Sequence, residues 1–141
     1  MIDKIFLDTN ILVYLFDKTE KQKQSRAKEL IAEYISGAKV IISVQVINEF
    51  INITSKKITF PISLSKQKEI IEFLNDLFII SSLTFDITLR AIETAGRYQL
   101  SYWDSLIISS ALDSTCNILF SEDMQNGLLI DGKLKIVNPF L

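Results

Sequence analysis

Four acidic residues stand at widely separated points of the chain, each beside a segment that could hold it in a fixed position. They are Asp8, Glu49, Asp104 and Asp123. Carboxylate oxygens are hard ligands that suit Mg²⁺ or Mn²⁺, and such a cation can activate a water molecule for phosphodiester hydrolysis. The first chemistry to consider is therefore metal-dependent hydrolysis, with these four acids as both metal ligands and catalytic residues.

Each acid, taken alone, also has a purely structural interpretation. Asp8 follows an apolar run and could cap the next helix, and Asp104 stands three residues after Ser101, as in a capping box. Glu49 lies on a polar helix face, and Asp123 could cap a short turn. The functional interpretation depends on convergence, because several carboxylates at one place repel one another and favour a bound cation.

Apolar runs alternate with amphipathic segments, and these are the elements that must position the acids. Strands are predicted at 4–7, 39–43, 79–83, 117–121 and 135–139. Helices are predicted at 11–16, 20–35, 44–57, 65–78, 84–98 and 102–115. This alternation predicts a three-layer α/β/α sandwich around a mostly parallel sheet of four or five strands. The four acids would then gather at the carboxyl ends of the strands, where parallel sheets bind ligands.

The composition bounds the domain and excludes several kinds of site. A chain of 141 residues with 48% hydrophobic and 23% charged residues is predicted to form one domain over 1–141. It has no His and a single Cys, which excludes a Ser-His-Asp triad, an intrachain disulfide and a Cys-rich zinc site. Since neither a signal-peptide pattern nor a membrane-length apolar run is visible, we expect a cytoplasmic protein without a membrane partner.

Four stretches of sequence carry a resemblance to a known family. They are FLDTNILVYLFD at 6–17, SVQVINEF at 43–50, SYWDSLIISSAL at 101–112 and LFSEDM at 119–124. In this order and spacing they resemble the PIN-domain ribonucleases, and most of all the VapC-type toxins of toxin–antitoxin pairs. The resemblance covers essentially the whole chain.

The resemblance implies roles for individual residues and for partners. Asp8, Glu49, Asp104 and Asp123 match the acidic quartet of the family, with Thr9, Asn10 and Ser121 as supporting polar residues. It also implies one or two Mg²⁺ or Mn²⁺ ions, an RNA substrate, a homodimer and a cognate antitoxin protein. The products would carry a 5′-phosphate and a 3′-hydroxyl.

Binding of RNA also requires cations, and two groups of basic residues are candidates. They are Lys18, Lys21, Lys23, Arg26, Arg90 and Arg97. For the lysine-rich group, a solvated helix surface is the simpler interpretation. Beside Asp104, Trp103 could stack on a base, although core packing is the favoured interpretation.

Three alternatives remain at this point. The same acids would serve a nuclease directed at DNA, and a PIN-like module that binds RNA or a partner without turnover would share the motifs. A receiver-like signalling domain is also α/β with acids at strand ends. It fits less well, because Asp8 has no acidic neighbour on its loop and Asp123 stands where a lysine would be expected.

Overall fold

The computed structural model describes residues 3–141, which form six strands and six helices around one sheet. The strands are β1 (Lys4–Leu7), β2 (Lys39–Ser43), β3 (Ile79–Ser81), β4 (Ile118–Phe120), β5 (Leu129–Ile130) and β6 (Leu134–Val137). The helices are α1 (Thr9–Phe16), α2 (Lys21–Tyr34), α3 (Val44–Lys56), α4 (Leu64–Leu77), α5 (Phe85–Tyr98) and α6 (Tyr102–Asp113).

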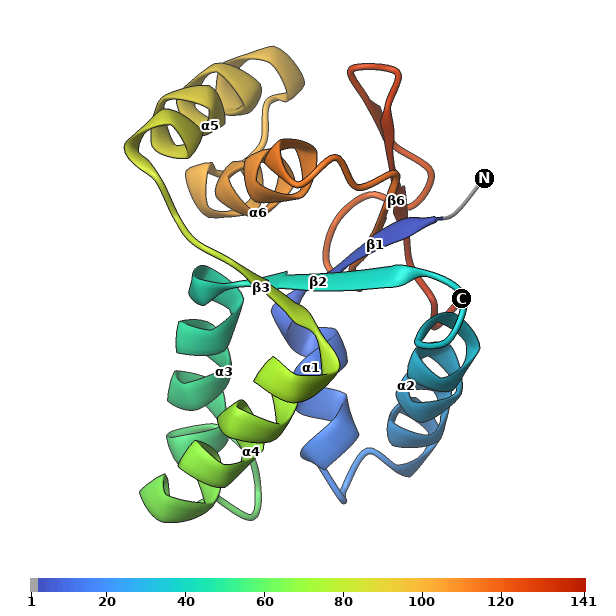
Figure 1. Cartoon of the computed structure of the whole chain (residues 1–141), viewed down its shortest axis with the longest axis vertical. Coiled ribbons are helices and arrows are strands. Elements are labelled where there is room, and N and C mark those ends of the chain that lie inside the picture. Colours follow the sequence, from blue (N-terminus) through green and yellow to red (C-terminus); the bar gives the residue numbers. More distant parts are fainter. Residues whose placement is uncertain (1–2) are drawn as a thin grey trace.

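The sheet has the strand order β3-β2-β1-β4-β6-β5, and every pair is parallel except β5 with β6. Helices α1 to α4 lie on one side of it and α5 and α6 on the other (Figure 1). The predicted α/β/α sandwich with a mostly parallel sheet is therefore confirmed. The sheet has one strand more than expected, because β5 is a two-residue antiparallel strand that pairs only with β6.

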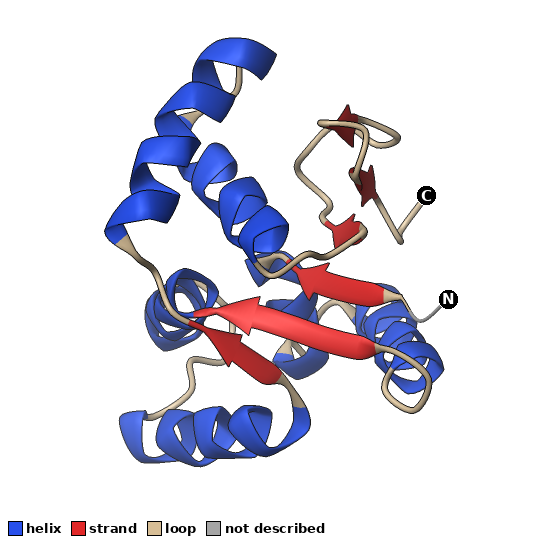
Figure 2. Ribbon diagram, turned by 45° about the horizontal axis from the view of Figure 1, so that its top comes forward, coloured by secondary structure: helices blue, strands red, loops and turns tan. Residues whose placement is uncertain are grey.

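The central strands are buried because helices cover both of their faces (Figure 2). In β1, Ile5, Phe6 and Leu7 are almost completely buried, and Val40, Ile41 and Ile42 of β2 are similar. This burial explains why the strands read in sequence as unbroken apolar runs rather than as an apolar–polar alternation. None of the helices in the described part of the chain is long and apolar enough to cross a membrane.

The topology places a ligand-binding edge next to β1. From β1 the chain passes to β2 on one side, and β4 joins β1 on the other, so the strand order reverses at this point. Leu7 pairs with Phe120 in the register of β1 and β4, which brings the next residues, Asp8 and Ser121, side by side. The carboxyl ends of β1, β2 and β4 thus meet where doubly wound sheets commonly bind ligands.

Candidate active site

Asp8 is the most deeply buried of the four acids, with 7% of its surface exposed. It stands between β1 and α1, and its Oδ1 caps that helix by accepting a hydrogen bond from the Thr9 amide at 2.7 Å. Its Oδ2 accepts a second bond from Ser121 Oγ at 2.8 Å. Helix capping and a site role therefore use the same side chain, so the two interpretations of Asp8 do not exclude each other.

Glu49 is held by side chains from two helices. Its Oε2 accepts a hydrogen bond from Thr9 Oγ1 at 2.7 Å, and its Oε1 accepts one from Gln45 Nε2 at 2.9 Å. Gln45 precedes Glu49 by one turn of α3, and the same amide nitrogen also contacts the backbone oxygen of Trp103 at 3.3 Å. Gln45 is a site residue absent from the predicted set, although its position four residues before Glu49 on one helix face was a usable signal.

Asp104 stands in the first turn of α6, whose N-cap is Ser101. The Asp104 amide donates to Ser101 Oγ at 3.1 Å, as the capping interpretation predicted. Asp123 lies in the loop after β4, and its Oδ2 accepts a bond from Asn10 Nδ2 at 3.0 Å. All three residues expected to support the acids therefore contact them: Thr9 binds Asp8 and Glu49, Asn10 binds Asp123, and Ser121 binds Asp8.

Two of the four carboxyl groups, those of Asp8 and Asp104, have a raised pKa, and other acids of the set contribute to both shifts. Burial is the main reason that the pKa of Asp8 is raised to about 6, and repulsion from Glu49 and Asp104 adds to the rise. The hydrogen bonds from Ser121 and the Thr9 amide lower the pKa and so offset part of this rise. Burial also raises the pKa of Asp104, with further repulsion from Asp123 and Glu49. Four segments far apart in sequence therefore contribute to one electrostatically coupled acidic cluster.

The donor set fits a hard divalent cation, because it offers only carboxylate, hydroxyl and amide oxygens and gains stability when its repulsion is neutralised. Within residues 3–141, however, no three acidic or cysteine side chains are already arranged as a metal cage. Asp104 and Glu49 are partly exposed and Asp123 is exposed, so the cluster is open to solvent at these three residues. Asp8 and Glu49 are each fixed by two hydrogen bonds, and Asp8 is also buried.

The basic residues predicted to contact RNA are less available than the sequence suggested. Four of the six make intramolecular contacts through their side chains. Lys23 pairs with Glu122, and Arg26 donates to the Pro139 backbone oxygen. Arg90 pairs with Asp86, and Arg97 pairs with Asp131. Lys18 and Lys21 are exposed.

Arg90 and Arg97 do share one helix face, as their spacing indicated. Together with Lys133 they line a polar hollow of about 250 Å³ between α5, α6 and the β5–β6 turn. Glu93 and Asp131 also line it, so its charge is mixed.

Trp103, beside Asp104, departs from the expectation. Trp103 is 66% exposed, so the prediction that it packs in the core was wrong. Only Tyr102 is partly buried, against the small cluster formed by Ile87, Ala91 and Leu106. Trp103 lies in the first turn of α6, one residue before Asp104, and its exposed ring packs edge-on against Tyr102 at 5.3 Å between centres.

Comparison with known proteins gives one family and a set of similar structures. The model of the family described as "PIN domain" matches residues 5–125. No curated protein matches the chain. A toxin–antitoxin complex from Klebsiella pneumoniae contains a chain with 21% identity and a TM-score of 0.70, over 96% of this chain and 97% of that one.

Two further solved structures are similar. VapBC2 from Rickettsia felis, bound to a promoter DNA fragment, has 19% identity and a TM-score of 0.64, over 94% of this chain and 96% of that one. VapC20 of Mycobacterium tuberculosis, a toxin that cleaves the sarcin–ricin loop, has 18% identity and a TM-score of 0.67, over 84% and 91%. At these identities the likeness shows a shared fold.

Proposed function

The chain belongs to the PIN domain family, and from this premise we propose that it is a metal-dependent endoribonuclease. We further propose that it is the toxin of a toxin–antitoxin pair, that Mg²⁺ or Mn²⁺ is its cofactor, and that it acts as a homodimer. The observation that carries the proposal is the coupled cluster of Asp8, Glu49, Asp104 and Asp123 at the strand ends. The similarity to toxin structures supports the toxin type and the antitoxin partner.

Some acids of the site are oriented by hydrogen bonds, and others are accessible to a ligand. Asp8 is held by the Thr9 amide and Ser121, and Glu49 by Thr9 and Gln45, so two carboxylates are oriented before any ligand arrives. A bound Mg²⁺ would neutralise charge on a phosphate and lower the pKa of a water molecule. Asp104, which is partly exposed, and Asp123, which is exposed, leave the cluster open to solvent on the side from which a substrate phosphate would approach.

The position of Asp104 at a helix N-terminus suits this arrangement. The first turn of α6 carries a partial positive charge from the helix dipole, which offsets part of the repulsion among the carboxylates. The same charge favours the approach of an anionic phosphate once a cation occupies the cluster. The RNA class of the substrate follows from the toxin type.

The deciding experiment is cleavage of total cellular RNA by the purified protein, freed of any bound inhibitor, with Mg²⁺ or Mn²⁺ and with EDTA. We expect metal-dependent cleavage that Asp8→Asn and Asp104→Asn reduce at least about a hundredfold, since each removes a charged ligand. A parallel assay on single-stranded and duplex DNA tests the alternative substrate. RNA binding without cleavage at saturating Mn²⁺ would overturn the proposal in favour of a binding module.

A further inference from the structure

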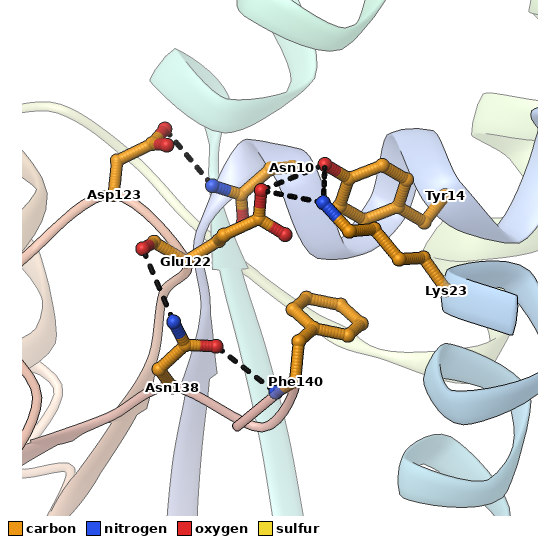
Figure 3. Close-up of polar contacts among 7 residues, drawn as sticks. All are labelled: Asn10, Tyr14, Lys23, Glu122, Asp123, Asn138 and Phe140. Carbon is orange, nitrogen blue, oxygen red and sulfur yellow. Dashed lines mark hydrogen bonds and ion pairs between the residues drawn. The ribbon is translucent and has the colours of Figure 1, made fainter. Parts of the chain in front are cut away.

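Two adjacent acids, Glu122 and Asp123, follow β4, and they have opposite surroundings. Asp123 is exposed and is bound by Asn10 within the acidic cluster. The Glu122 carboxylate points the other way: its Oε1 accepts hydrogen bonds from Tyr14 Oη at 2.9 Å and from Lys23 Nζ at 3.0 Å (Figure 3). Sequence alone could not separate the roles of these neighbours, and the structure does.

Both acids are bound by the same face of one helix. Asn10 and Tyr14 are four residues apart on α1, which places their side chains one turn apart on one side of the helix. Asn10 binds Asp123, and Tyr14 binds the preceding residue, Glu122. Helix α1 therefore holds the loop after β4 at two successive residues.

Lys23 completes this contact from α2. Its Nζ binds both the Glu122 carboxylate and Tyr14 Oη, and it lies 4.9 Å from the centre of the Tyr14 ring. The hydrogen bond to Glu122 is the main reason that the pKa of Lys23 rises above its usual range. Lys23 is thus paired within the fold rather than free of intramolecular contacts.

The end of the chain covers the same group. The Phe140 ring packs edge-on against Tyr14 at 5.2 Å between centres and lies 5.9 Å from Lys23 Nζ. Asn138 Nδ2 donates to the Glu122 backbone oxygen at 3.3 Å, and Asn138 Oδ1 accepts from the Phe140 amide at 2.9 Å (Figure 3). The backbone and the side chain of Glu122 are therefore both fixed.

Lys23 is also the cation that compensates Glu122. Glu122 Oε2 is buried and has no hydrogen-bond partner among residues 3–141, so the carboxylate is removed from water on that side. A partly buried charge that loses its partner is strongly unfavourable. The ion pair also keeps the Glu122 charge away from the acidic cluster, which would otherwise contain a fifth carboxylate.

We propose that Lys23 and Tyr14 are positioning residues, which bind Glu122 and thereby fix the adjacent Asp123 within the acidic cluster. We call Lys23, Tyr14 and Glu122 the latch. For its effect on cleavage, this inference rests on the proposed nuclease function. Its structural part, the fixing of the loop at 121–126, does not.

The structural part is tested by hydrogen–deuterium exchange on the metal-free full chain. In Lys23→Met we expect peptides covering 121–126 to exchange roughly tenfold faster than in the wild type, with the β1 and β2 peptides unchanged, because only local opening becomes easier. Lys28→Met is the matched control: it removes the same charge from an exposed position of α2 and should leave exchange at 121–126 as in the wild type. Unchanged exchange at 121–126 in Lys23→Met, or an equal rise in every peptide, would overturn the proposal.

A milder variant covers the case in which Lys23→Met does not fold. Tyr14→Phe keeps the ring against Phe140 and removes only the hydroxyl that binds Glu122. It should raise exchange at 121–126 by a smaller factor. Wild-type exchange in this variant would exclude Tyr14 from the latch.

The functional part is tested by the Mg²⁺ dependence of RNA cleavage. Lys23→Met should raise the Mg²⁺ concentration for half-maximal cleavage by about tenfold, as loss of an outer-shell contact does at metal sites, and saturating Mg²⁺ should restore most of the rate. Adding Glu122→Gln to Lys23→Met should recover much of the Mg²⁺ affinity, because no charge is then left unpaired. A wild-type Mg²⁺ dependence in Lys23→Met would overturn this part. If the wild type itself does not cleave RNA, the proposed function fails, and the exchange experiment still decides the latch.

Discussion

Asp8 combines two demands that oppose each other. Its burial makes the charged form costly, yet two hydrogen bonds, from the Thr9 amide and from Ser121, favour that charged form. The result is a carboxyl whose pKa, at about 6, lies between its usual value and neutrality. At neutral pH the ionised Asp8 carboxylate destabilises the folded state, and a bound cation would reduce this destabilisation.

This cost should be visible as a pH dependence of stability in the metal-free protein. Because the pKa of Asp8 rises from 3.8 to about 6 on folding, the folded state binds the proton more tightly than the unfolded chain. The protein is therefore more stable at low pH, where Asp8 is protonated. The free energy of unfolding should fall as the pH rises from about 4 to about 6, and above that range the loss due to Asp8 should be about 3 kcal/mol. Urea unfolding with EDTA at intervals between pH 4 and 7.5 measures it.

The variant Asp8→Asn serves as the control for that titration. Asparagine still caps a helix, and it has no charge to bury. We expect the variant to lose most of the decline in stability between pH 4 and 6 and to be more stable than the metal-free wild type at pH 7.5. The same decline in both proteins would assign the pH dependence to another group.

Gln45 should matter for cleavage more than for folding. It is 6% exposed and donates to Glu49, on its own helix α3, and to the backbone oxygen of Trp103 in α6, so it fixes the position of Glu49 relative to α6. Gln45→Leu keeps the volume and removes the hydrogen bonds, and we expect it to lower the cleavage rate about tenfold or more, as loss of an outer-shell partner does at metal sites. Steady-state kinetics beside a melting curve measures both effects, and a large fall in Tm with full activity would contradict the assignment.

At the scale of elements, α6 carries Asp104 and is fixed at its start by Ser101. The Asp104 amide donates to the Ser101 hydroxyl, and Ser105 Oγ donates to the Ser101 backbone oxygen at 2.8 Å. The cap therefore determines where the first turn begins and with it the position of the acid. A change at Ser101 should affect both the helix and the site.

Ser101→Ala tests this coupling. Loss of the cap should lower the free energy of unfolding by about 1 kcal/mol, and we also expect weaker Mg²⁺ activation because the first turn frays. Thr84→Ala, at the cap of α5, is the matched variant: it removes a similar hydrogen bond away from the acids. A similar loss of Mg²⁺ activation in both variants would mean that general destabilisation, and not the position of Asp104, is responsible.

The sequence predicted the elements closely where periodicity and capping residues agree. The predicted helix at 84–98 and the observed α5 (Phe85–Tyr98) differ by one residue, because Thr84 is the cap. The strand β5 was missed because two residues are too short to show a periodic pattern of apolar residues. Its pairing depends instead on the turn before β6.

The parts of the site that sequence could not give depend on tertiary contacts. The partner of Lys23 is Glu122, which lies 99 residues away, and no local pattern indicates that pairing. Trp103 was placed in the core by its apolar character, but it stands on the outer side of the first turn of α6, where no element covers it. The acids themselves are brought together by contacts between distant segments, such as those of Thr9 with Glu49 and of Ser121 with Asp8.

At the scale of the whole molecule, one helix leaves an apolar face uncovered in the single chain. On α5, Phe85, Leu89 and Ile92 follow the spacing of one helix face and are 77%, 45% and 57% exposed. Apolar side chains grouped in this way are typical of interaction surfaces. Because a homodimer is proposed, this face is where we expect the second copy to bind.

Leu89→Glu tests this face. A charge at its centre should prevent burial against a second copy, and we expect the molar mass from light scattering to fall from that of a dimer to that of a monomer. Leu64→Glu is the control, since Leu64 of α4 is also an exposed leucine, at 77%, but lies outside this face. A dimer that persists in Leu89→Glu would place the interface elsewhere.

The pairing of β1 with β4 also has a consequence for the time at which the acidic cluster can form. Synthesis proceeds from the N-terminus, and early segments begin to fold before later ones exist. A nascent chain that ends before β4 (Ile118–Phe120) already carries Asp8, Glu49 and Asp104, but it lacks Ser121, Asp123 and the strand that closes the sheet beside β1. The four acids can therefore meet only after β4 and the loop that follows it have left the ribosome, so a nascent chain that stops before Asp123 cannot form the acidic cluster.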